Sequence, residues 1–223
     1  MIPSTIRSFV RRSGRITSSQ QQALEELWPR YGVESNQFLN LEQLFGRKAE
    51  KHLEIGFGRG DTLVTMAKIH PERDYIGIDV HRPGIGHLLK QIEINQLTNI
   101  RICCADVVDV LQQALPPHSL DAVYLFFPDP WPKQRHHKRR LVQPYFVNLL
   151  AQRMKSGSHL YLATDWQDYA EQMLQILETT PEFINLVAQN SFAPRPAERP
   201  LTPFEQRGLR LGHPVWDLFY QRQ

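Results

Sequence analysis

The strongest constraint on the fold is an alternation of strand-like and helix-like segments that starts near residue 50. Short apolar runs bounded by turn residues are typical of buried strands, and longer segments with helically spaced apolar residues are typical of helices. We expect strands at residues 52–55, 75–80, 100–105, 122–127 and 159–164, and helices at 61–69, 85–96, 107–115, 141–154 and 166–177. Strands that alternate with helices predict an α/β fold with a doubly wound, mostly parallel, Rossmann-like sheet.

The end of the chain departs from this alternation. Residues 183–189 and 215–220 are two further strand-like segments, which bring the expected sheet to seven strands. The stretch between them has no helical pattern and contains four prolines: Pro194, Pro196, Pro200 and Pro203. Two closing strands without a crossover helix form a hairpin, so we expect the last strand to run antiparallel to the others. A long irregular stretch inside a compact domain is usually functional or mobile.

The beginning of the chain is predicted to be a basic arm followed by a helix. The arm contains four arginines: Arg7, Arg11, Arg12 and Arg15. A capping box from Thr17 to Gln20 predicts the start of the helix, and Gly32 its end. With 223 residues the chain is expected to form one domain overall, in which residues 1–49 are the arm and helix and residues 50–223 the main domain.

Cysteine usage and hydropathy limit the classes of protein that are possible. The two cysteines, Cys103 and Cys104, are adjacent, so they are expected to be reduced thiols and cannot build a thiolate zinc site. Histidines at 81, 136, 137 and 213 lack the paired spacing of metal ligands, so we expect no metal. The sequence has no apolar run long enough to cross a membrane. These features predict an intracellular, cytoplasmic protein.

An acidic residue between two prolines, followed by a basic run, is the most distinctive local motif. Asp129 lies between Pro128 and Pro130, directly after the expected strand at 122–127. The carboxyl end of such a strand is where open α/β sheets bind ligands, and the prolines hold the carboxylate stiffly. Residues 131–140 include five Lys or Arg residues and no acid. A rigid carboxylate beside a dense basic loop indicates chemistry on a nucleic acid. The alternative is a proline turn before a solvated basic loop.

A glycine-rich loop follows the first strand. Residues 56–60 have the spacing Gly-x-Gly-x-Gly, which differs from the dinucleotide-binding fingerprint. Asp79, at the end of the second strand, can bind both hydroxyls of a ribose, and Asp106, at the end of the third, can meet an adenine edge. Glu54 can hold an ammonium group. Together these acids suit S-adenosylmethionine, which carries a sulfonium, an amino group and a ribose but no pyrophosphate.

These motifs closely resemble those of the bacterial tRNA (guanine-N7)-methyltransferase family, and the resemblance covers almost the whole chain. The matching motifs are residues 14–17, 54–60, 77–81, 128–133, 135–140, 163–166 and 207–213. The resemblance implies a class I S-adenosylmethionine-dependent methyltransferase domain. It also implies methyl transfer to N7 of guanine at position 46, in the variable loop of tRNA.

The resemblance and the motifs together assign three sets of site residues. The cofactor-binding set is Glu54, Gly56, Gly58, Asp79, Asp106 and Asp129, of which Asp129 is also the expected catalytic residue. The substrate-binding set is Lys133, Asp165, Thr202, Pro203, Phe204 and Glu205. The RNA-binding set is Arg135, His136, His137, Lys138, Arg139 and Arg140. The family usually has glutamate in place of Asp79 and a basic residue in place of Pro203.

The residues leave several roles open. Guanine N7 has a free lone pair, so no proton must leave before it attacks a methyl group. Asp129 can stabilise the cationic purine that forms, or it can bind the N1–H and amino edge of guanine. Asp165 and Glu205 are the other candidates for that edge, and Asp165 is alternatively a helix N-cap. Lys133 either binds phosphate or is solvated, and Trp131 either stacks on a base or packs over the strand end.

Three rival functions fit these residues less well. A methyltransferase for an exocyclic amine of a base usually has two consecutive prolines before the aromatic residue, which the 129–131 segment lacks. A nicotinamide-dependent dehydrogenase needs the other glycine spacing. A non-catalytic RNA-binding protein leaves the acids at the strand ends without a role. We therefore expect tRNA as the partner, no membrane and no metal, while monomer and homodimer both remain open.

Overall fold

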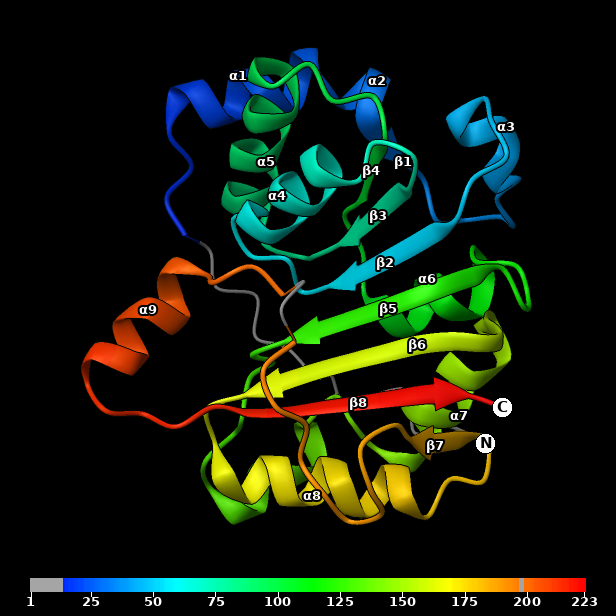
Figure 1. Ribbon diagram of the computed structural model, residues 1–223. Helices are drawn as coiled ribbons and strands as arrows, with labels where there is room; N and C mark the ends of the chain where they lie inside the picture. The colour runs from blue at the N-terminus through cyan, green and yellow to red at the C-terminus, as the bar shows by residue number, and fades with distance from the viewer. Residues whose placement is uncertain (1–13, 197–198) are drawn as a thin grey trace.

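A single eight-stranded sheet forms the centre of the computed structural model, which describes residues 14–196 and 199–223 (Figure 1). The strands are β1 (Gly32–Val33), β2 (Lys51–Ile55), β3 (Asp74–Ile78), β4 (Ile100–Cys103), β5 (Leu120–Phe126), β6 (Met154–Thr164), β7 (Phe183–Asn185) and β8 (Trp216–Arg222). Their order across the sheet is β1-β4-β3-β2-β5-β6-β8-β7. All neighbouring pairs from β1 to β6 are parallel.

Helices cover both faces of the sheet, as a doubly wound fold requires. They are α1 (Ser18–Glu26), α2 (Trp28–Tyr31), α3 (Leu41–Phe45), α4 (Asp61–Ile69), α5 (Arg82–Ile94), α6 (Val107–Gln113), the 3₁₀ helix η1 (Gln134–Arg139), α7 (Pro144–Arg153), α8 (Gln167–Glu178) and α9 (Pro203–Arg210). Buried apolar residues of α1, α4 and α5 form one core with β3, β4 and β5. Those of α6, α7 and α8 form a second core on the opposite face. The predicted α/β fold is confirmed.

The amino-terminal part of the chain joins the sheet rather than only preceding it. β1 pairs with β4, with Gly32 opposite Ile102 and Val33 opposite Cys103, so the sheet has eight strands where seven were expected. A two-residue strand is too short to show the alternation on which strand prediction rests. The single helix expected up to Gly32 is divided into α1 and α2, and Pro29 lies in the first turn of α2. The expected domain boundary at residue 50 stays a prediction.

The closing hairpin has the expected direction. β8 is antiparallel to both β6 and β7, so the last strand is the reversed one. The segment before β8, however, contains the helix α9, and the expectation of no helix there was wrong. Thr202 caps this helix by accepting a hydrogen bond from the Glu205 amide at 3.1 Å. α9 has only 8 residues, which is shorter than the window over which apolar spacing predicts a helix.

Candidate active site

The sheet order brings the acidic residues of five strand ends to one edge. β4, β3, β2, β5 and β6 are consecutive parallel neighbours, so their carboxyl ends lie side by side (Figure 1). Asp106, Asp79, Glu54, Asp129 and Asp165 belong to these ends in that order. From β2 the chain goes on to β3 on one side, whereas β5 lies on its other side. β2 is therefore the topological switch point, where open α/β sheets bind ligands.

The glycine loop after β2 leaves open space above its backbone. Gly56 and Gly58 have φ of 71° and 60°, values that favour glycine. A Cβ atom added to either residue would meet no atom within 4 Å. The loop turns tightly, since the Gly60 amide donates to the Phe57 carbonyl at 2.8 Å. A ligand can therefore approach this backbone closely at the switch point.

Asp79 is held rigidly by the same loop. Its two carboxylate oxygens accept hydrogen bonds from the amides of Gly58 and His81, each at 2.8 Å. Burial raises the pKa of Asp79, while the backbone hydrogen bonds from His81 and Gly58 oppose that rise. A carboxylate offers about four acceptor sites, so those not used by these amides suit the ribose hydroxyls. Asp79 thus has a role that the sequence did not reveal, which is to fix the glycine loop.

Glu54 is the most unusual group at this edge. Glu54 is only 4% exposed. Its Oε2 atom is buried without a hydrogen-bond partner among the residues that the structure describes. Burial, followed by the nearby carboxylates of Asp79 and Asp61, raises the pKa of Glu54 to about 8. A buried carboxyl group without a partner is costly. The site therefore fits a cationic group, such as the α-amino group of S-adenosylmethionine.

Asp106 is fixed by the start of a helix. It is the N-cap of α6, and its side chain accepts a hydrogen bond from the Val108 amide at 3.0 Å. The residue is still half-buried rather than enclosed. It lies at the end of β4, two strands from the glycine loop, as the expected adenine-binding role requires.

The loop that carries Asp129 has unusual backbone geometry. Phe127 and Trp131, on either side of it, have φ of 53° and 46°, which is uncommon for bulky residues. The Phe127 amide donates to the Ala163 carbonyl at 2.7 Å, which ties the loop to β6. Asp129 itself is exposed. Backbone in such regions persists only where the surroundings enforce it, and it clusters at functional sites.

Arg140 is one of the residues that enforce this geometry. Its side chain is 1% exposed. It donates to the Pro130 carbonyl at 2.8 Å and to Gln172 of α8 at 2.6 Å, and it forms an ion pair with Asp168. Its guanidinium also lies 4.8 Å from the centre of the Tyr169 ring. The expectation that Arg140 contacts RNA is therefore wrong, because a buried and fully bonded guanidinium cannot reach a phosphate.

The rest of the basic run forms an exposed turn, η1. Arg135, Lys138 and Arg139 are exposed, whereas His136 and His137 are half-buried. The Arg139 guanidinium lies 5.0 Å from the centre of the Trp131 ring, and the His136 ring meets that ring edge-on at 5.8 Å. Desolvation, together with the neighbouring cations, lowers the pKa of His136. Trp131 thus packs against the basic turn.

Two of the substrate candidates remain accessible. Lys133 is exposed directly before η1. Asp165 is half-buried at the end of β6, and the N-cap of α8 is Trp166, which has no side-chain capping bond. The alternative that Asp165 caps this helix is therefore wrong. Both residues stay candidates for contact with a bound nucleotide.

The segment at 202–205 is arranged differently from the expectation. Thr202 caps α9, Pro203 begins the helix, and Phe204 is exposed, with its ring centre 5.2 Å from that of Phe127. Glu205 is only 2% exposed, and its two oxygens bind the Arg199 guanidinium at 2.6 and 2.7 Å. A carboxylate held in this way has no free edge for guanine, which disfavours Glu205 among the three candidates for reading that edge.

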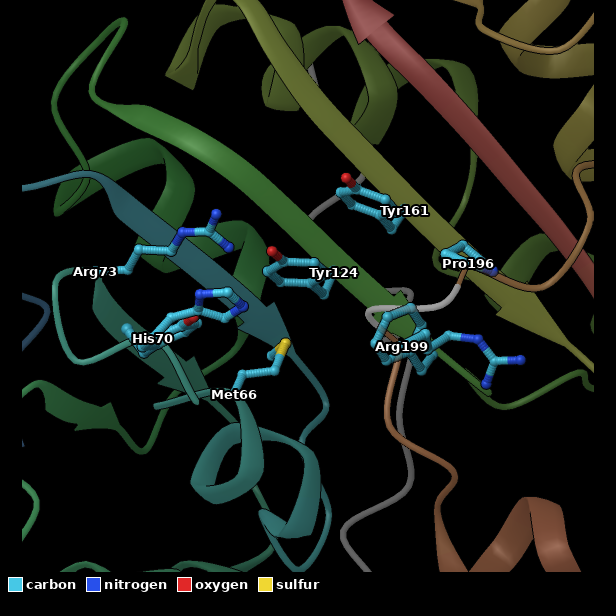
Figure 2. Close-up of a pocket in the computed structure, with 9 residues that line it drawn as sticks. Met66, His70, Arg73, Tyr124, Tyr161, Pro196 and Arg199 are labelled. Carbon is cyan, nitrogen blue, oxygen red and sulfur yellow. The ribbon is translucent and has the colours of Figure 1, made fainter. Parts of the chain in front are cut away.

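A small cavity lies beside this segment, against the face of β5 and β6. Figure 2 shows Tyr124 and Tyr161 next to each other on the sheet, with Arg199 near the ends of the strands. The cavity holds about 20 Å³, which is enough for about one water molecule. The cavity is therefore too small for S-adenosylmethionine. Arg199 lies in a proline-rich stretch and was not among the site residues expected from the sequence.

Two absences apply to the described part of the chain. Within it, no helix is long and apolar enough to cross a membrane. Among the same residues, no cluster of three or more His, Cys, Asp or Glu side chains is placed to hold a metal ion.

Comparison with known proteins agrees with this geometry. Residues 48–218 match a family model described as "Putative methyltransferase". The tRNA (guanine-N(7)-)-methyltransferase of Alkalilimnicola ehrlichii is 55% identical over 221 residues, which cover 98% of this chain and 93% of that protein. The enzyme of the same description from Nitrosospira multiformis is 55% identical over 219 residues, with 98% and 95% covered.

Solved structures show the same fold at low sequence identity. A 16S rRNA methyltransferase superposes with a TM-score of 0.62 at 15% identity, and the match covers 86% of this chain and 98% of that one. A 30S ribosomal A1408 methyltransferase gives a TM-score of 0.54 at 13% identity, with 86% and 95% covered. Fold, strand-end acids and close relatives agree, and the chain belongs to the tRNA (guanine-N7)-methyltransferase family.

Proposed function

We propose that this protein transfers the methyl group of S-adenosylmethionine to N7 of guanine 46 in the variable loop of tRNA. The observation that carries the proposal is the row of carboxylates at the carboxyl edge of the sheet, in which Asp129 lies next to an exposed basic turn. In this proposal the enzyme acts in the cytoplasm, as a monomer or a homodimer.

Three carboxylates of the chain hold the cofactor. Glu54 binds the α-amino group, Asp79 the ribose hydroxyls and Asp106 the adenine edge, over the open backbone of Gly56 and Gly58. S-adenosylmethionine supplies an electrophilic methyl group on its sulfonium sulfur. Asp129 borders the same space from the neighbouring strand end. Because N7 carries its lone pair without a proton, no residue of the chain has to act as a base.

The chain contributes positioning and fixed charge to the reaction. Lys133 and Asp165 orient the target nucleotide so that N7 lies in line with the methyl group and sulfur. The exposed Asp129 carboxylate, on its stiff loop, stabilises the positive charge that develops on the purine. Glu205 has no part in this contact, since Arg199 occupies its carboxylate.

The salt dependence of tRNA binding tests whether Arg135 and Lys138 of the basic turn contact phosphates. We expect Arg135→Ala combined with Lys138→Ala to weaken binding of every tRNA alike, because phosphate contacts position RNA without reading its sequence. The slope of log affinity against log salt should flatten by roughly 0.7–0.9 for each lost contact. Fluorescence-detected binding from 50 to 300 mM salt measures this slope. An unaltered slope would mean that the turn is only solvated.

The position of the methyl group tests the proposed function itself. Guanine N7 lies in the deep groove of an RNA helix, which side chains do not reach, so the target must lie in an irregular region such as the variable loop. Borohydride followed by aniline cleaves RNA at 7-methylguanosine. We expect one cut in the variable loop of tRNA treated with enzyme and S-adenosylmethionine, and none when adenosine replaces guanosine 46. A cut elsewhere, or methylation of an exocyclic amine, would contradict the proposal.

A further inference from the structure

Helix α9 projects from the domain at the carboxyl edge of the sheet (Figure 1, orange helix at the left). A surface helix normally packs an apolar stripe on the core. In α9, by contrast, Phe204 is 47% and Leu209 48% exposed, and Glu205 is buried. Burial of an apolar stripe, which holds the other helices on the core, therefore does not fix the position of α9.

A buried ionic cluster holds α9 instead. The Arg199 guanidinium binds both oxygens of Glu205 and lies 2.8 Å, through Nε, from Oδ1 of Asp217 in β8. The three side chains are between 1% and 4% exposed. Paired contacts between a guanidinium and a carboxylate fix orientation as well as distance. The cluster therefore sets the direction in which α9 leaves the domain.

The same cluster touches the loop of Asp129. The Arg199 guanidinium lies 5.7 Å from the centre of the Phe127 ring. The centre of the Phe204 ring lies 5.2 Å from the centre of the same Phe127 ring. Phe127 begins the loop that carries Asp129, and η1 follows that loop directly. The first turn of α9 and the basic turn are thus attached to the same short segment of chain.

The outer surface of α9 carries positive charge only. Arg207 and Arg210 are exposed, and neither forms an ion pair with any residue that the structure describes. Glu205 is the single acid between Arg199 and Trp216, and it points inward to Arg199. A cationic surface without acids, beside a nucleic-acid-modifying site, is complementary to phosphates.

We propose that α9 is a second tRNA-binding surface, in which Arg207 and Arg210 bind phosphates and the Arg199–Glu205–Asp217 cluster holds the helix in place. The proposal rests on the proposed function, because it requires a tRNA at the Asp129 loop. Glu205 and Arg199 are positioning residues in it, since they act on RNA only through α9.

Binding of a tRNA transcript tests the surface directly. We expect Arg207→Ala with Arg210→Ala to lower the affinity at 100 mM salt roughly tenfold, and to flatten the salt slope by roughly 1.4–1.8 for two lost contacts. The affinity for S-adenosylmethionine should stay unchanged. The matched control is Arg30→Ala with Lys48→Ala, which removes the same charge from exposed positions outside the carboxyl edge. Equal slopes for the two double variants would overturn the proposal.

The positioning cluster needs a readout that loss of structure alone does not give. We expect Glu205→Gln to raise KM for tRNA and to flatten the salt slope of tRNA binding, while kcat at saturating tRNA is nearly retained. Glu205→Asp, which keeps the charge, should bring KM and the salt slope part of the way back to the wild-type values. A variant that loses kcat and thermal stability with an unchanged slope would contradict the positioning role. If wild-type protein itself does not bind tRNA, the proposed function fails. If the wild-type protein binds tRNA, but the α9 variants have the same tRNA affinity and salt slope as the control variant, only the inference about α9 fails.

Discussion

Replacement of Asp129 by Asn is expected to slow methyl transfer by about 10²–10³-fold while S-adenosylmethionine binds nearly normally. The amide keeps the size of the side chain and the shape of the loop but removes the fixed negative charge. That charge matters in the transition state, when the purine becomes cationic. It matters much less for a bound cofactor whose amino group and ribose are held by Glu54 and Asp79.

Single-turnover kinetics with saturating tRNA and cofactor isolate this effect from binding and product release. The control is Asp109→Asn, which makes the same change at an exposed carboxylate in the first turn of α6. We expect this control to react at the wild-type rate. Wild-type turnover in Asp129→Asn would make Asp129 a structural residue and leave the charge-stabilising mechanism without support. A parallel measurement on Asp165→Asn separates the two carboxylates.

The sequence predicts the scaffold well because the scaffold depends on local patterns. The five strands predicted from apolar runs are all present, and most of their residues are buried. The acids of the site follow from the same patterns, since parallel strands bring their carboxyl ends to one edge. β1 and α9 were missed because both are too short for a clear periodicity.

The sequence does not predict which charged residues are buried. Arg139 and Arg140 are adjacent and chemically identical, yet Arg139 is exposed and Arg140 is enclosed by Pro130, Gln172 and Asp168. Glu205 is removed from the substrate set in the same way by Arg199. The partners of a buried charge lie at no fixed spacing, six residues away for Glu205 and up to 32 for Arg140, so no local pattern encodes them.

The second large effect concerns Glu54, whose replacement by Gln is expected to stabilise the protein without cofactor. Burial raises the pKa of this carboxyl to about 8 from an ordinary value of 4.5. Between these two pH values the folded state binds a proton that the unfolded state has lost, so stability falls as pH rises from 4.5 to about 8. Glutamine does not titrate. At pH 7 we expect Glu54→Gln to gain on the order of 3 kcal/mol, measured by urea unfolding, and to gain nothing at pH 4.

The same replacement should weaken S-adenosylmethionine binding about 10²-fold or more, because a buried ammonium group loses a charged partner. In the wild-type protein at pH 7, Glu54 must ionise when the ammonium arrives, so binding should release close to one proton. Calorimetry in two buffers of different ionisation enthalpy measures that proton, and Glu54→Gln should release none. Glu42→Gln, at an exposed position in α3, is the control.

Proton release that persists in Glu54→Gln would assign the titration to another group. Equal affinity would place the amino group of the cofactor elsewhere. Together, the gain in stability and the loss of binding would identify Glu54 as a residue kept for its ligand at the expense of the fold.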